Sequence, residues 1–380
     1  MVINRKIPAL QDKGAGERQE IQMNRPDLTR LKSCMRRAEA GEELTIGFFG
    51  GSITQDSLAT KHENCYAYRV FRWWEETFPK AAFHYVNGGI GGTTSHYGVS
   101  RVVTDMLMYQ PDFVAVDFSV NDDPNEFFQE TYEGLIRKML TWSSKPAVLL
   151  LNNVFYDTGK NAQEYHNRVG DWYHLPHVSI KDTVWLRMKA GAFTREEITP
   201  DGLHPNDKGH GLVAAEITSY LEQVKEHMWE DESEQPVPSA MTDNAYENAR
   251  RLTIRESCPK LDGFRADTEE KKGHLDHFKN GWIGKKSGDL ILFEIEASCI
   301  AVQYRKTIHH PARKAELILD GDREHSVLLD GNFDEDWGDC LYLEPVLHHG
   351  KSGRHTVEIK VLPDEYETAE PFYLMALITA

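Results

Sequence analysis

Four short segments of the chain carry side chains of the types used in nucleophilic chemistry. The first runs Gly50-Gly51-Ser52-Ile53-Thr54, where two glycines permit a sharp backbone turn directly before a serine hydroxyl. This is not a G-x-S-x-G nucleophile elbow, because Thr54 stands where the last glycine belongs. Taken alone, a serine at such a place is more often the cap of a helix than a nucleophile.

The second and third segments contain groups that can donate hydrogen bonds to an anion. Residues 87–95 read NGGIGGTTS, and so many glycines let backbone N–H groups approach a ligand closely. A phosphate cradle fits poorly, because there is no Walker lysine and the G-x-G-x-x-G spacing is not met. In residues 119–123, Asn121 offers a neutral amide suited to a developing oxyanion. The alternative for both segments is a simple turn.

The fourth segment pairs a carboxylate with an imidazole. Asp201 and His204 stand three residues apart in a turn-like stretch that ends Pro205-Asn206. A hydrogen bond between them would fix the tautomer of the ring and raise its basicity. The chain has 17 histidines, most of which are expected on the surface, but the neighbouring Asp201 and Pro205 distinguish His204.

The elements that must position these segments are predicted between residues 27 and 229. Asp27 is expected to cap a first helix that ends at Gly41. Short buried strands are predicted at 44–49, 83–86, 113–118, 148–151 and 177–180, and helices at 66–78 and about 207–227. This alternation indicates a parallel sheet covered on both faces. The four segments then meet at the carboxyl ends of the strands, where such sheets bind ligands.

The chain of 380 residues is long enough for two domains, and its pattern of apolar and polar residues changes after residue 230. Residues 231–249 are acidic, contain proline and are predicted to be a linker between a domain at 1–230 and one at 250–380. Apolar residues alternate in 289–296 and 356–361, and the turn pairs Asp320-Gly321 and Asp330-Gly331 divide the region. The second domain is therefore predicted to be an antiparallel β-sandwich of jelly-roll type.

The composition of the chain indicates which binding partners and which cellular compartment to expect. With 43 basic and 60 acidic residues, the net charge of −17 opposes nucleic acid and anionic membranes and suits neutral substrates such as sugars. The first 24 residues lack the apolar core of a signal peptide, and no apolar run could span a bilayer. Five cysteines without regular spacing are expected to be free thiols. These features predict a cytoplasmic protein and leave its oligomeric state open.

Together the four segments resemble the SGNH (GDSL-like) hydrolase superfamily over roughly residues 40–229, in family order. The resemblance implies a flavodoxin-like, three-layer α/β domain that acts as a serine esterase without a metal or other cofactor. The site residues that it implies are Ser52 as nucleophile, His204 as general base, Asp201 as the group that orients His204, and an oxyanion hole formed by the N–H groups of Ser52 and Gly92 and the side chain of Asn121.

One position departs from the family pattern. Gly51 replaces the aspartate of the family's G-D-S sequence. This replacement removes no catalytic group, but it leaves the geometry of the turn before Ser52 open.

The second half of the chain resembles, by its architecture, the accessory domain of the carbohydrate acetylesterases of carbohydrate esterase family seventeen. That resemblance implies removal of acetyl groups from acetylated plant oligosaccharides, with mannan-type chains favoured. Trp337 and Asp336 lie in a polar loop at 332–339, where an aromatic face suits a sugar ring and a carboxylate suits its hydroxyls. We expect this loop to lean over Ser52. The alternative is that Trp337 is a core residue or an interdomain anchor.

Other interpretations remain open at this point. A lipase or thioesterase of the same superfamily would need a long apolar acyl channel, and an arylesterase would act on small esters. A carbohydrate-binding protein on an inactive hydrolase scaffold is disfavoured by the intact serine, aspartate and histidine. The pairs His309-His310 and His348-His349 lack a coherent set of metal ligands and are interpreted as surface residues at strand ends.

Overall fold

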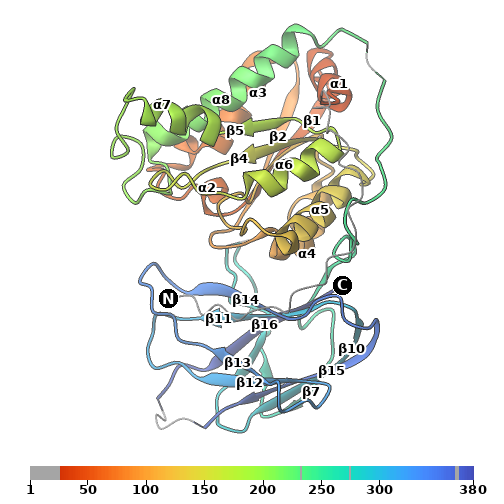
Figure 1. Ribbon diagram of the computed structural model, residues 1–380, viewed down its shortest axis with the longest axis vertical. Coiled ribbons are helices and arrows are strands. Elements are labelled where there is room, and N and C mark those ends of the chain that lie inside the picture. Colours follow the sequence, from red (N-terminus) through yellow and green to blue (C-terminus); the bar gives the residue numbers. More distant parts are fainter. Residues whose placement is uncertain (1–25, 232, 274, 364–367) are drawn as a thin grey trace, which may run out of the picture.

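The computed structural model describes residues 26–231, 233–273, 275–363 and 368–380, which form an α/β part and an all-β part (Figure 1). A parallel sheet of five strands in the order β2-β1-β3-β4-β5 forms the centre of the α/β part. Its strands are β1 (Glu43–Gly50), β2 (Ala82–Gly89), β3 (Phe113–Asp117), β4 (Ala147–Asn152) and β5 (His177–Ser179). All five predicted strands are present. In this strand order the ligand crevice lies at the carboxyl ends of β1 and β3.

Helices cover both faces of the parallel sheet. The longer ones are α1 (Thr29–Glu39), α3 (Tyr66–Thr77), α4 (Ser95–Asp105), α5 (Glu126–Leu140), α6 (Gln163–Trp172) and α8 (Asp207–Glu226). Successive strand residues point to opposite faces, so Phe48 packs with α1, α3 and α8, whereas Phe49 packs with α4, α5 and α6. Short turns complete this part: α2 (Ser52–Gln55), η1 (His62–Asn64), η2 (Leu107–Tyr109), η3 (Lys181–Trp185) and α7 (Leu186–Lys189).

The start of the first helix differs from the prediction by one residue. The N-cap residue is Leu28 and not Asp27. Asp27 still contributes, because its Oδ1 accepts the backbone N–H of Thr29 at 2.9 Å. The predicted helices at 66–78 and 207–227 match α3 and α8 to within one residue at each end.

The all-β part consists of two packed antiparallel sheets, in the orders β13-β12-β15-β10-β7 and β14-β11-β16-β9-β8, with β6 paired to β16. The strands are β6 (Arg250–Leu252), β7 (Lys260–Asp262), β8 (Arg265–Ala266), β9 (Trp282–Gly284), β10 (Leu290–Ala297), β11 (Ile300–Lys306), β12 (Lys314–Leu319), β13 (Val327–Asp330), β14 (Cys340–Leu347), β15 (Gly353–Val361) and β16 (Phe372–Thr379). The predicted sandwich is therefore present. Ile291 and Phe293 are buried between the sheets as the alternation requires, but Ile295 is only half-buried.

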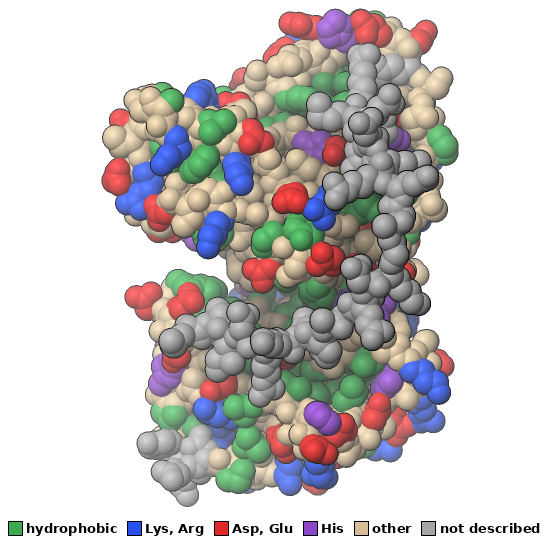
Figure 2. All heavy atoms as spheres, in the orientation of Figure 1, with side chains coloured by type: hydrophobic (Ala, Val, Ile, Leu, Met, Phe, Trp, Pro, Cys, Tyr) green, Lys and Arg blue, Asp and Glu red, His purple; other side chains and the backbone are tan. Residues whose placement is uncertain are grey.

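The two parts share one hydrophobic cluster. The outer face of the sheet that contains β11, β14 and β16 lies against α4 and α5 (Figure 1), and residues such as Ala301 and Met375 pack with Val99 and Tyr132. An apolar contact of this kind holds two domains in a fixed relation more firmly than a polar one. Figure 2 shows the surface hollowed between the two lobes on the left of the view.

The predicted linker at 231–249 packs against the rest of the molecule. Its described residues form no helix or strand, but Tyr246 is buried between the two parts. The carboxylate of Glu133 on α5 accepts the backbone N–H groups of Met241 and Thr242 at 2.5 and 2.8 Å. Among the described residues, no helix is both long and apolar enough to cross a membrane.

Candidate active site

The structure brings Ser52, His204 and Asp201 into one hydrogen-bonded chain. Nε2 of His204 lies 2.8 Å from Oγ of Ser52, and Nδ1 of the same ring lies 2.7 Å from Oδ2 of Asp201. Ser52 begins α2 directly after β1, whereas the other two precede α8. This is the arrangement in which an imidazole removes the proton of a serine hydroxyl while a carboxylate orients the ring.

Asp201 is fixed by more than its contact with His204. Its Oδ1 accepts the backbone N–H groups of Leu203 and His204 at 2.9 and 2.8 Å. Burial acts to raise the pKa of Asp201, but the hydrogen bonds from His204 and Leu203 outweigh burial and hold the pKa below its usual value. The carboxylate is therefore ionised at neutral pH. It keeps the ring proton on Nδ1 of His204 and leaves Nε2 free to accept the serine proton.

Glycine at position 51 leaves room for the side chain of Asn121. A Cβ atom on Gly51 would lie 2.2 Å from Oδ1 of Asn121, far inside van der Waals contact. Gly51 in place of the family's aspartate thus lets the Asn121 side chain approach the start of α2.

Three candidate oxyanion donors have no hydrogen-bond acceptor among the described residues. The N–H of Ser52 is in the first turn of α2, where it has no intrahelical acceptor. Gly92 follows β2 with φ +66°, a left-handed conformation suited to glycine, and neither its N–H nor the Asn121 amide has a hydrogen-bond partner in the described part of the chain. Three unused donors at strand ends are what a tetrahedral oxyanion needs.

The choice of Gly92 rather than Gly91 gains support from a neighbouring side chain. The N–H of Gly91 donates to Oε1 of Gln55 at 2.5 Å. Because that donor is already used inside the protein, Gly92 is the better candidate in this loop.

A buried pair of side chains connects the two loops that carry Gly92 and Asn121. Asp122 accepts the backbone N–H of Ser95, at the start of α4, and lies 3.0 Å from Nε2 of His166. The side chains of Asp122 and His166 are both fully buried, and the ring of Tyr132 stacks on His166 with centroids 3.7 Å apart. Sequence reasoning missed this pair, since 44 residues separate its members and no local pattern links them.

Asp117 lies at the end of β3, beneath the same loops. Burial raises the pKa of its carboxyl group to about 6, although hydrogen bonds from Asn153 and Ser119 partly oppose the shift. Nδ2 of Asn153 donates to Oδ2 of Asp117 at 2.7 Å. The backbone carbonyl of Asp117 accepts the N–H of Gly51, so the residue also holds the turn before the serine.

The loop at 332–339 of the all-β part reaches the α/β part at Gly92. A Cβ atom on Gly92 would lie 3.4 Å from Cη2 of Trp337. Trp337 is 55% exposed, which excludes a core role, and its Nε1 donates to Glu335 at 2.5 Å. The ring of Phe333 packs edge-on against Trp337, and Asp336 is exposed beside it. The loop therefore places an open aromatic face next to a candidate oxyanion donor.

A cleft of about 340 Å³ lies between the two parts, with Gly92 and Trp337 in its wall. Phe127, Phe128 and Tyr342 add aromatic surface to the lining. Gln303 on β11 also lines the cleft; it is fully buried, and neither polar atom of its amide has a partner among the described residues. Sequence reasoning missed Gln303, whose only signal is one polar residue in an otherwise apolar run. A mostly apolar cleft with a few polar groups is typical of a small-molecule site.

Known proteins resemble the chain in sequence and in fold. The chain matches the GDSL-like lipase/acylhydrolase family over residues 48–212. Two crystal structures of a two-domain esterase active on acetylated mannans, one co-crystallised with mannopentaose, are 50% identical to the chain. In both, the match covers 94% of this chain and 96% of the other, with TM-scores of 0.90 for the mannopentaose structure and 0.92. Among curated proteins, none matches the chain.

Proposed function

The chain belongs to the GDSL-like lipase/acylhydrolase family and is a carboxylic ester hydrolase, and we propose that it removes acetyl groups from mannan-type oligosaccharides through an acyl-enzyme on Ser52. The observation that carries the proposal is the hydrogen-bonded chain from Ser52 through His204 to Asp201. This hydrogen-bonded chain, with unused hydrogen-bond donors nearby, favours an active esterase over an inactive scaffold.

The geometry supports a two-step reaction. Nε2 of His204 removes the hydroxyl proton as Oγ of Ser52 attacks the acetyl carbonyl carbon. The negative charge that develops on the carbonyl oxygen is stabilised by the N–H groups of Ser52 and Gly92 and by the Asn121 amide. The intermediate then collapses, and His204 returns the proton to the sugar oxygen, which leaves as an alcohol. In the second step His204 activates a water molecule, which releases acetate and restores the serine.

Features of the cleft support a sugar substrate. An exposed tryptophan next to Gly92 provides a flat apolar surface in the wall of the cleft. A net charge of −17 suits an uncharged ligand. The esterase structures that resemble this chain over nearly its whole length act on acetylated mannans, which makes mannan-type chains the first substrates to test.

Mass spectrometry of acetylated oligosaccharides tests the proposed activity. We expect wild-type protein to remove mass increments of one acetyl group from acetylated manno-oligosaccharides, and more slowly from acetylated xylo-oligosaccharides. Ser52→Ala should leave both unchanged. Faster hydrolysis of an octanoyl than of an acetyl model ester would contradict the proposal in favour of a lipase or thioesterase. Hydrolysis of aryl acetates without any loss of acetyl groups from sugars would favour an arylesterase.

The loop at 332–339 has a separate test. We propose that Trp337 stacks on the sugar and that Asp336 binds its hydroxyls. Trp337→Ala should then raise KM for acetylated manno-oligosaccharides by roughly 10-fold or more, the loss expected for a stacked aromatic contact, while hydrolysis of a small aryl acetate stays within about twofold. Equal kinetics of wild type and variant on the oligosaccharide would rule out a role for the loop in binding.

The cysteines support a reducing compartment. All five are free thiols, and Cys258 is exposed while the other four are buried. Disulfides form readily in secreted proteins, so we propose that the chain works in the cytoplasm on imported oligosaccharides. Recovery of the protein mainly from the culture medium, rather than from the cell extract, would contradict this location.

A further inference from the structure

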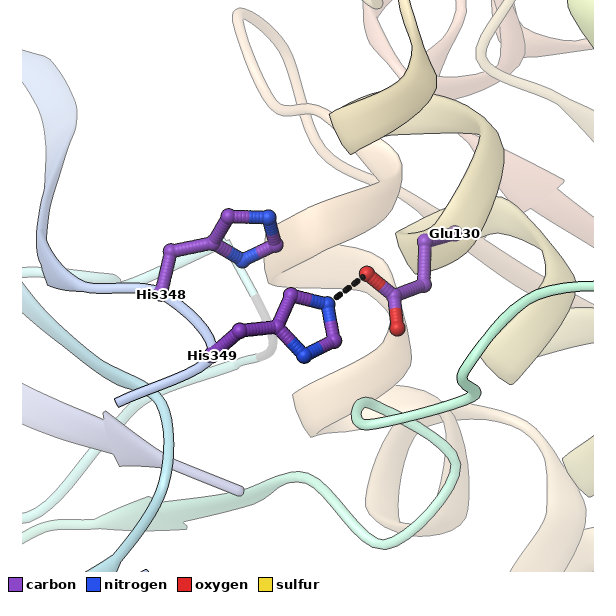
Figure 3. Close-up of side chains that lie close together, drawn as sticks. All are labelled: Glu130, His348 and His349. Atoms are coloured by element: carbon purple, nitrogen blue, oxygen red, sulfur yellow. Dashed lines mark hydrogen bonds and ion pairs between the residues drawn. The ribbon is translucent and has the colours of Figure 1, made fainter. Parts of the chain in front are cut away.

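Glu130, His348 and His349 come together at the border between the two parts of the molecule (Figure 3). Glu130 lies on α5, and the two histidines follow the end of β14. One nitrogen of each imidazole and one carboxylate oxygen lie within 4.8 Å of one another. Both histidines are exposed at a strand end, as the sequence predicts, and Glu130 lies beside them across the domain border.

The carboxylate of Glu130 is buried without a permanent positive charge beside it. Glu130 is 4% exposed, and within the described ranges no lysine or arginine forms an ion pair with its carboxylate. Oε1 accepts the backbone N–H of Ala245 at 2.9 Å, and Oε2 lies 2.8 Å from Nε2 of His349. Buried carboxylates are costly unless they are paired with a cation or coordinate a metal.

The backbone places both imidazoles on the same side. His349 has φ +50°, the left-handed region that few residues other than glycine adopt. Consecutive side chains of an extended strand point in opposite directions, but here the two ring centroids are only 4.3 Å apart. The hydroxyl of Tyr246 lies 2.9 Å from Nδ1 of His348 and orients that ring, as outer-shell groups do around metal ligands.

We propose that Glu130, His348 and His349 bind one divalent transition-metal ion of the zinc class, with water completing the coordination. Two imidazoles and a carboxylate form a ligand set that zinc accepts, and the exposed histidines give the ion access from solvent. The ion joins α5 of the α/β part to the turn after β14. Its role is structural, and it takes no part in the reaction at Ser52.

Equilibrium dialysis of the untagged full-length chain against ZnCl₂, after treatment with EDTA, tests the site. We expect one zinc ion per wild-type chain. Glu130→Gln keeps the acceptor for Ala245, and His349→Asn keeps a residue that tolerates a positive φ, so both variants should fold. Each should bind zinc at least 10-fold more weakly, and Tyr246→Phe roughly 10- to 100-fold more weakly. His309→Ala, which changes an exposed histidine in another adjacent pair, is the matched control and should bind as wild type.

A second measurement needs no variant. Zinc that binds only the folded chain must raise the midpoint of thermal unfolding of wild-type protein, and EDTA must reverse the rise. Zinc binding by His349→Asn as tight as by wild type, or an unchanged midpoint of the wild-type protein, would overturn the proposal. Neither result depends on esterase activity.

Discussion

Replacing Gly51 by alanine tests the geometry of the candidate oxyanion hole with a single methyl group. The new Cβ would lie 2.2 Å from Oδ1 of Asn121. The atom that the new methyl group meets belongs to the end of a flexible side chain, which can move. The chain should therefore fold normally, with the Asn121 amide pushed out of position.

The expected cost follows from the role of that amide. Loss of one oxyanion donor lowers kcat by roughly 10²- to 10³-fold, or about 3–4 kcal/mol in the activation barrier. KM should change little, because the amide interacts most strongly with charge that develops in the transition state. A double-mutant cycle isolates the mechanism: in an Asn121→Ala background, Gly51→Ala should have almost no further effect on kcat.

The assay is steady-state hydrolysis of an aryl acetate, combined with thermal unfolding of each variant. Gly353→Ala is the control, because a Cβ there meets nothing within 4 Å. Wild-type kcat in Gly51→Ala would refute the proposed contact between the glycine and Asn121. Equal losses from Gly51→Ala in the presence and absence of the Asn121 side chain would show that the methyl group acts elsewhere.

Two further predictions concern buried or paired carboxylates. Because burial raises the pKa of Asp117 to about 6, protonation stabilises the folded chain at acid pH, and this stability is lost as pH rises through 6. In urea unfolding, wild type should therefore lose about 1 kcal/mol of stability relative to Asp117→Asn between pH 5 and pH 7.5. In the variant, the amide of Asn153, whose Oδ1 has no partner among the described residues, should turn to match the new side chain. A pH-independent difference would contradict this prediction. Asp201→Asn keeps the acceptor Oδ1 but presents an N–H to Nδ1 of His204, which moves the ring proton from Nδ1 to Nε2. Because Nε2 can then no longer accept the serine proton, kcat should fall roughly 10⁴-fold. A loss below 10-fold would contradict the proposed role of Asp201.

The α/β part was largely predictable because its signals are local. Continuous apolar runs such as residues 44–49 and 113–118 can only be satisfied by burial on both faces of a parallel sheet. Once the strands are placed, topology brings their following loops together, so Ser52 and Asn121 were expected to be neighbours across the sheet edge. The alternation of apolar residues in β15 likewise predicted one of the buried faces of the sandwich.

What could not be predicted depends on contacts between distant residues. His166 reaches Asp122 across 44 residues, and its neighbourhood in the sequence contains nothing that indicates a partner. In the sequence, Gln303 is an ordinary polar residue of a strand. Only the structure shows that it is buried at the border between the two parts. Gly51 illustrates the same limit: the sequence shows that aspartate is missing, but only the structure shows how closely Asn121 approaches this position.

The most direct test of the proposed mechanism is labelling of the chain with a fluorophosphonate, followed by mass spectrometry of its peptides. Such reagents form a stable covalent bond only with a serine activated by a neighbouring base. The proposed mechanism predicts one label per wild-type chain, located on Ser52, and no label on Ser52→Ala. An unlabelled wild-type chain, or a label that persists on Ser52→Ala, would contradict the assignment of Ser52 as the nucleophile.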